Sequence, residues 1–139
     1  MGDLQEDLSI AQEEGKQAIL LFFEMDECPF CQRMKKTIFN QQQVHDDFKP
    51  KFNAIPIDIE GDVELIDFAG NSMTSKHFAK KIHKVRATPV MIFFDLQGQV
   101  LYRHTGAVRN ATEFLQLGDY ISSGAYKKQR FSVYKRQQK

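Results

Sequence analysis

Six consecutive apolar residues, Ala18–Phe23, are followed closely by two cysteines that lie three positions apart. An unalternating run of this kind is typical of a strand that is buried on both faces of a parallel sheet. Pro29 suits the first turn of a helix, where its missing N–H is not needed. Apolar residues then recur every four positions and predict the buried stripe of that helix, namely Phe30, Met34 and Ile38. The pattern predicts a buried strand leading into a helix that carries Cys28 at its amino end.

The remaining sequence alternates between helical and extended patterns. The first predicted elements are an amphipathic helix ending at Gly15, an edge strand over 52–59 that carries Pro56, and a short hairpin within 60–76. A helix follows from Ser75. Strands over 90–94 and 100–102 are then joined by the turn 95–98, and a long helix is capped by Asn110. The two later helices are expected to bury Phe78, Ala79 and Ile82, and Phe114, Leu117 and Ile121. Residues 41–51 are expected to be a polar connection. This order predicts an α/β fold in one domain, 1–139.

The charge balance bears on the class of partner. Nineteen Lys and Arg against eighteen Asp and Glu give a net charge of +1, so a bulk attraction to nucleic acid is not expected. No apolar run approaches the roughly 18 residues that a membrane-spanning helix requires. The tail 127–139 holds six Lys or Arg and no acid, and we expect a solvated helix or a frayed end there.

The two cysteines suit thiol–disulfide chemistry. A Cys-x-x-Cys pair at the start of a helix brings two sulfurs within reach of each other, and the helix dipole favours the thiolate of the first. A thiolate attacks a disulfide, and a second cysteine can then resolve the mixed disulfide. We therefore assign Cys28 as the nucleophile and Cys31 as the resolving thiol. No cofactor beyond this redox pair is expected.

Other uses of the pair remain open. A zinc site would need two more ligands, and His77 and His83 lie at a spacing that would place them about 120° apart around a helix, so we expect no metal. A copper-handling protein would bind Cu(I) through both thiolates, with Met25 or Met91 as a candidate third ligand. A third hypothesis is an interaction module whose cysteines are vestigial.

At these residues the chain resembles the thioredoxin superfamily. More closely, it is similar to the SoxW-like thioredoxin-related proteins of bacterial sulfur-oxidation clusters. The resemblance to the superfamily rests on the Cys28–Cys31 junction and on residues 85–90 and 95–98. The resemblance to the closer group rests on residues 14–16, 59–62 and 120–127. The resemblance covers nearly the whole chain.

The resemblance implies a thioredoxin fold with a mixed sheet of four to five strands, an amino-terminal helix and a basic helical extension at the carboxy terminus. It implies a cis Thr88–Pro89 peptide facing the cysteines, and the substrate-binding residues would be Pro29, Phe30, Thr88, Pro89 and Gly106. It also implies a periplasmic monomer that acts on a disulfide-bearing protein or small thiol, with a membrane thiol-reductase as electron donor. A cytoplasmic location is the alternative.

The chain also departs from the thioredoxin pattern. Phe22 stands where thioredoxins bury an aspartate that accepts the proton of the resolving cysteine, and Glu24 is a candidate for that role. The dipeptide between the cysteines is close to that of glutaredoxins, but the glycine pair and acid that hold glutathione are missing after Pro89. A glutaredoxin-like activity is thus a weaker alternative.

The direction of electron flow follows from charge near the nucleophile. Glu24, Asp26 and Glu27 precede Cys28, and like-charge repulsion disfavours a thiolate. A comparatively stable disulfide form favours a reductase or an exchanger of intermediate potential. Pro29 points the other way, because the resemblance associates proline at this position with oxidising members.

Overall fold

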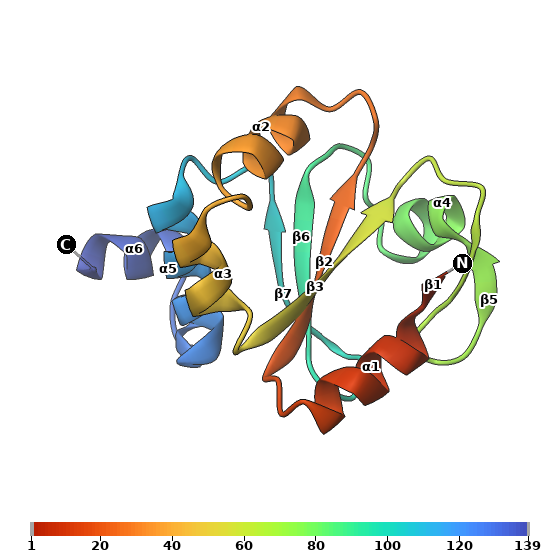
Figure 1. The fold of residues 1–139 in the computed structure, drawn as a ribbon, viewed down its shortest axis with the longest axis horizontal. Coiled ribbons are helices and arrows are strands. Elements are labelled where there is room, and N and C mark those ends of the chain that lie inside the picture. Colours follow the sequence, from red (N-terminus) through yellow and green to blue (C-terminus); the bar gives the residue numbers. More distant parts are fainter. Residues whose placement is uncertain (1, 139) are drawn as a thin grey trace.

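The central element of the fold is a mixed four-stranded sheet. The computed structural model describes residues 2–138. Figure 1 shows the sheet between two layers of helices. The strands, in spatial order, are β3 (Phe52–Asp58), β2 (Ala18–Glu24), β6 (Val90–Phe94) and β7 (Val100–Thr105). β3 runs parallel to β2, whereas β6 is antiparallel to both β2 and β7. The predicted buried strand, edge strand and hairpin are confirmed.

Helices cover both faces of this sheet. One face packs against α2 (Pro29–Thr37), α3 (Gln42–Phe48) and α5 (Ala111–Ser122), and the other against α1 (Leu4–Glu13), α4 (Ser75–His77) and the π-helical turn η1 (Phe78–Ile82). The side chains of β2 alternate between the two cores, with Leu20 and Phe22 on the α2 side and Leu21 and Phe23 on the α1 side. The thioredoxin fold expected from the resemblance is confirmed.

A second, smaller sheet flanks the α1 side. It contains β4 (Glu64–Ile66) and β5 (Ser72–Thr74), which form the antiparallel hairpin predicted within 60–76, and β1 (Gly2–Asp3), which pairs in parallel with β4. Gly70 turns the hairpin with φ +91°, a conformation that residues with a Cβ rarely adopt. The pairing of β1 with β4 attaches the hairpin to the beginning of the chain.

Two predictions about helices are wrong. Residues 41–51 are not a polar connection, because α3 lies within them and buries Val44 and Phe48. Ile82 is 49% exposed rather than buried. The helix that begins at Ser75 widens into a π-turn, in which the N–H of His83 donates to the carbonyl of Phe78 at 3.1 Å, so the expected α-helical spacing does not apply. No helix within residues 2–138 is both long and apolar enough to cross a membrane.

The basic carboxy-terminal segment is docked rather than frayed. After α5 it forms a 3₁₀ turn, η2 (Ala125–Lys127), and the helix α6 (Phe131–Gln137). Phe131 is 5% exposed and lies 5.2 Å from the ring of Tyr120, centroid to centroid. The hydroxyl of Tyr120 donates to the carbonyl of Gln129 at 2.5 Å. Lys139, the last basic residue of the predicted tail, lies outside the described residues.

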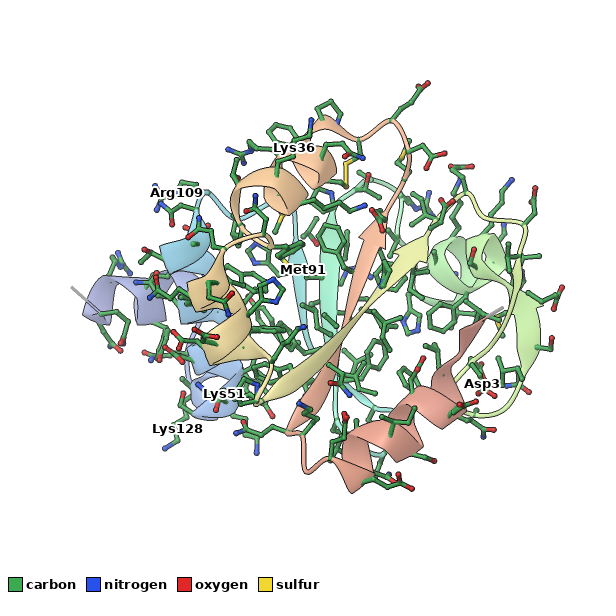
Figure 2. All side chains as sticks on the ribbon, viewed as in Figure 1. Asp3, Lys36, Lys51, Met91, Arg109 and Lys128 are labelled. Carbon is green, nitrogen blue, oxygen red and sulfur yellow. A yellow bond between two sulfur atoms is a disulfide. The ribbon has the colours of Figure 1, made fainter. Side chains whose placement is uncertain are left out.

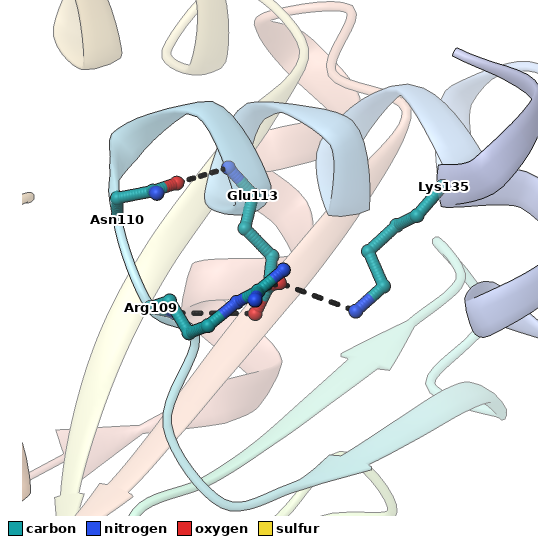
Figure 3. A network of polar contacts seen from close by, with 4 residues as sticks. All are labelled: Arg109, Asn110, Glu113 and Lys135. Carbon is teal, nitrogen blue, oxygen red and sulfur yellow. Dashed lines mark hydrogen bonds and ion pairs between the residues drawn. The ribbon is translucent and has the colours of Figure 1, made fainter. Parts of the chain in front are cut away.

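A buried carboxylate joins α6 to the start of α5 (Figure 3). Glu113 accepts hydrogen bonds from the backbone N–H and the Nε of Arg109, both at 3.1 Å, and from Lys135 Nζ at 3.2 Å. Its own N–H donates to Asn110 Oδ1 at 2.9 Å, which is the helix cap predicted from the sequence. Burial opposes ionisation of this carboxyl, but the bonds from Arg109 and Lys135 outweigh it and lower the pKa of Glu113.

We predict that Glu113→Gln lowers the free energy of unfolding by about 1–3 kcal/mol, because the charge-assisted bonds to Arg109 and Lys135 are lost. Because folding lowers the pKa of Glu113, its contribution is present above the ordinary value of about 4.3 and disappears as the pH falls through the folded value. The variant should lose that part of the acid dependence. Urea denaturation at several pH values measures both effects.

The matched control is Glu13→Gln, which removes an exposed carboxylate from α1. It should change the free energy of unfolding by no more than about 0.5 kcal/mol. Equal losses in the two variants would contradict a specific role for the Glu113 network.

Candidate active site

The residues singled out from the sequence gather at one end of the central sheet, where β2 and β7 end and β6 begins. β2 ends at Glu24, and its neighbour Phe23 pairs with Val90, the first residue of β6. Val90 pairs in turn with Thr105 at the end of β7. Three loops therefore meet at this end of the sheet. The loop after β2 carries the cysteines, the loop before β6 carries Thr88 and Pro89, and the loop after β7 carries Gly106. The disulfide is visible at the amino end of α2 in Figure 2.

Cys28 and Cys31 are joined in a disulfide, with their Cα atoms 5.2 Å apart. Cys28 is the N-cap residue of α2, and its Sγ accepts the N–H of Cys31 at 3.2 Å. Cys28 is 5% exposed, whereas Cys31 is fully buried at 0%. Both cysteines are therefore buried in the disulfide form, and only Cys28 keeps some accessible surface.

The loop that precedes β6 contains Thr88 and Pro89. The peptide bond between them is cis, Thr88 is half-buried and Pro89 is buried. The N–H of Gly106 donates to the carbonyl of Pro89 at 2.9 Å. Gly106 has φ +94°, although a Cβ there would meet no atom within 4 Å, so backbone conformation rather than space calls for glycine.

Phe30 differs from its sequence-based prediction. It is 58% exposed, and the buried face of α2 consists of Cys31, Met34 and Ile38. The helix is as predicted, but its buried stripe begins one residue later and repeats at three and then four residues. The guanidinium of Arg33 lies over the Phe30 ring, 5.5 Å from its centroid. Phe30 and the exposed Pro29 thus give the site an apolar surface next to the disulfide.

Glu24 lies on the α2 side of the sheet, as Phe22 does, and forms an ion pair with Lys35 of α2. Its side chain is 15% exposed. Phe22 is 5% exposed and packs edge-on against Phe39, so the position of the thioredoxin aspartate is apolar. Glu24 and Lys35 line a pocket of about 250 Å³ between β2, β3 and the α2–α3 connection, whose other walls include Phe22, Phe39 and Pro56.

The geometry of the other candidate ligands bears on metal binding. His83 is half-buried among the rings of Phe23, Phe78 and Phe94. Burial lowers the pKa of His83, and the positive charge of Arg103 acts in the same direction. Across residues 2–138, no three His, Cys, Asp or Glu side chains are placed to hold a metal ion together. Met91 lies in the same buried cluster as the two cysteines.

Solved structures with the same fold support this description. A thioredoxin-fold protein from Helicobacter pylori is 24% identical, with a TM-score of 0.70 over 86% of this chain and 83% of that one. A candidate disulphide-isomerase from Bacteroides thetaiotaomicron is 26% identical, with a TM-score of 0.64 over 84% and 88%. The reduced DsbD C-terminal domain from Neisseria meningitidis is 18% identical, with a TM-score of 0.60 over 84% and 91%.

A Cys-x-x-Cys disulfide at the start of a helix on this fold defines a thiol–disulfide oxidoreductase. Residues 4–122 match the family described as Thioredoxin-like domain, and the chain belongs to that family. No curated protein matches the sequence. The η2 and α6 segment lies beyond the matched range.

We predict that Gly106→Ala raises the KM for a disulfide substrate, because an alanine at φ +94° is strained and displaces the N–H that bonds to Pro89. Gly124→Ala is the matched control, since Gly124 has φ +80° and is equally free of close neighbours, but follows α5. Both variants should lose about 1–2 kcal/mol of unfolding free energy. A KM that rises equally in both would contradict a role for Gly106 in the site.

Proposed function

We propose that the protein reduces disulfide bonds in proteins or small molecules. The observation that carries this proposal is the asymmetry of the Cys28–Cys31 pair, in which Cys28 caps α2 and keeps 5% of its surface accessible whereas Cys31 keeps none. Phe30 and the Thr88–Pro89 loop border the pair and would contact the substrate. The backbone of Thr88 would pair with an extended substrate segment.

The reaction would take two exchange steps. In the reduced protein, the Cys28 thiolate attacks one sulfur of the substrate disulfide, forms a mixed disulfide and releases the other substrate sulfur as a thiolate. Cys31 then loses its proton and attacks the sulfur of Cys28. This step forms the Cys28–Cys31 disulfide and releases the second substrate thiolate. Two electrons pass to the substrate, and a dithiol donor must restore the reduced pair.

Glu24 is our candidate for the base that receives the proton of Cys31. Its carboxylate is held on the α2 side of the sheet by Lys35, which lies one helical turn after Cys31. The 250 Å³ pocket lies beside Glu24 and Lys35. Glu24 would therefore take the place of the aspartate that is missing at Phe22.

The charges near Cys28 favour the reducing direction less strongly than the sequence suggested. Glu24 is neutralised by Lys35, so only Asp26 and Glu27 remain to disfavour a thiolate, and both are exposed and screened by solvent. An oxidising exchanger is thus the second candidate. Copper handling is a third, with Met91, which packs on the same face of the sheet as the cysteines, as the candidate third ligand.

The compartment and the partners belong to the same proposal. Resemblance to the sulfur-oxidation group at 59–62 and 120–127 supports a bacterial periplasmic location, a sulfur-compound client and a membrane thiol-reductase as donor. The protein would act as a monomer. A cytoplasmic location is the alternative.

We predict a reversible two-electron transition of the Cys28–Cys31 pair, more negative than about −200 mV, in a glutathione titration followed by thiol alkylation and mass. Cys28→Ser should abolish turnover and leave Cys31 unalkylated in the folded protein, because Cys31 is buried. A value near −120 mV would instead identify an oxidant. If no reversible transition occurs and Cu(I) binds through both thiolates, the copper hypothesis replaces this one.

We predict that Glu24→Gln lowers the rate of the resolving step by roughly a hundredfold, because the amide cannot accept the Cys31 proton. The mixed disulfide should accumulate, and the pH dependence of the rate should flatten. Asp26→Asn is the control, since it removes an exposed acid from the same loop. Similar losses in both variants would show a general effect of charge and would exclude proton transfer by Glu24.

A further inference from the structure

The segment before Thr88 carries an unusual concentration of positive charge. No acid occurs between Asp67 and Asp95, whereas Lys80, Lys81, Lys84 and Arg86 lie within seven residues. Lys80 is paired with Glu60 at 2.5 Å. Lys81, Lys84 and Arg86 are exposed, and within residues 2–138 none of the three forms an ion pair. We call residues 81–86 the basic loop.

The basic loop leads into Thr88 and Pro89, at the end of the sheet from which the cysteine loop departs. Arg86 is two residues from Thr88 and Lys84 is four, so their Cα atoms lie within about 7 and 14 Å of that of Thr88. Thr88 and Pro89 lead into Val90, which pairs with Phe23. The cysteine loop departs from the same end of the sheet. The side chains of Arg86 and Lys84 can therefore contact residues that flank a disulfide attacked by Cys28.

The backbone of the basic loop is held in place. Arg103 of β7 donates from its guanidinium to the carbonyls of His83 and Lys84, the latter at 3.2 Å. Val85 is completely buried, and its N–H donates to the carbonyl of Ala79 at 2.9 Å. Lys84 has φ +56°, which a lysine seldom adopts. A loop fixed in this way presents its charges at defined positions instead of through a flexible segment.

The cysteine loop carries the opposite charge. Asp26 and Glu27 lie in the cysteine loop, and both are exposed. A substrate bound at Cys28 and Thr88 would therefore have these acids next to Cys28, and the basic loop next to Thr88, in the order of the chain. Charges of both signs next to the site can select among substrates.

We propose that the basic loop recognises an acidic segment of a protein substrate next to its disulfide. The inference deepens the proposed reductase function and rests on it. A protein segment fits better than a small disulfide, because Lys81, Lys84 and Arg86 are spread along six residues of chain that also contain Ile82, which is 49% exposed. A segment with acidic side chains and one apolar residue complements this surface.

The test compares three substrates. Two synthetic peptides contain the same disulfide, flanked by acidic residues in one and by basic residues in the other, and the third substrate is the neutral bis(2-hydroxyethyl) disulfide. We expect kcat/KM for the acidic peptide to exceed that for the basic peptide by about tenfold at low salt. The ratio should approach one at roughly 1 M salt, where the screening length is about 3 Å.

The variant that tests the loop is Lys84→Asn combined with Arg86→Gln. Asparagine tolerates the positive φ of residue 84 better than most residues, so the backbone is preserved. The matched control, Lys128→Gln with Arg136→Gln, removes one lysine and one arginine from exposed positions on the carboxy-terminal segment. Lys128 is labelled in Figure 2, far from the disulfide. We expect the loop variant to lose the preference and the control to keep it.

Each outcome is informative. Turnover of the neutral disulfide without a preference between the peptides would overturn this inference and leave the proposed function intact. Equal loss of preference in both variants would show steering by net charge and would also overturn it. Absence of turnover with all three substrates would overturn the proposed function, and this inference with it. The salt dependence of the unaltered protein decides the question even if the loop variant does not fold.

Discussion

Burial of β2 on both faces is the constraint on which the core and the site depend. Its apolar side chains are nearly inaccessible, and each contributes about 1.5–3 kcal/mol on transfer from water. Hydrogen bonds to β3 and β6 fix its two edges. The strand therefore has one register and one end point. The cysteine loop begins at that end point, so the position of Cys28 relative to Thr88 follows from the packing of residues far from the chemistry.

The elements that could be predicted from the sequence are those whose burial leaves a continuous or strongly periodic pattern. The apolar runs over 18–23 and 90–94 are the two central strands, and Gly15 and Asn110 mark a helix end and a helix start. The helix α3 could not be found in this way, because it buries only Val44 and Phe48 in an otherwise polar stretch. Its helical state depends on tertiary contacts with the sheet, which a local pattern does not contain.

The features of the site likewise divide into those that a local sequence pattern predicts and those that it does not. The pair of cysteines was visible in the sequence, and so was the loop that faces them. Contacts between distant elements were not, including the ion pair between Glu24 and Lys35 and the bond from Lys135 to Glu113. Such partners depend on strand alternation, helix rotation and loop path at once. The ion pair changes the electrostatic argument about Cys28, because one of the three nearby acids is neutralised.

The distribution of charge affects how the molecule behaves at surfaces. Fifteen of its eighteen acids lie in residues 1–70, and thirteen of its nineteen Lys and Arg lie in 71–139. The acidic helix α1 and the basic helix α6 lie on opposite sides of the sheet in Figure 1. A net charge of +1 is therefore the sum of a mainly acidic first half and a mainly basic second half of the chain. Chromatographic resins of either charge can retain such a protein near neutral pH, each by a different face, and orient it differently.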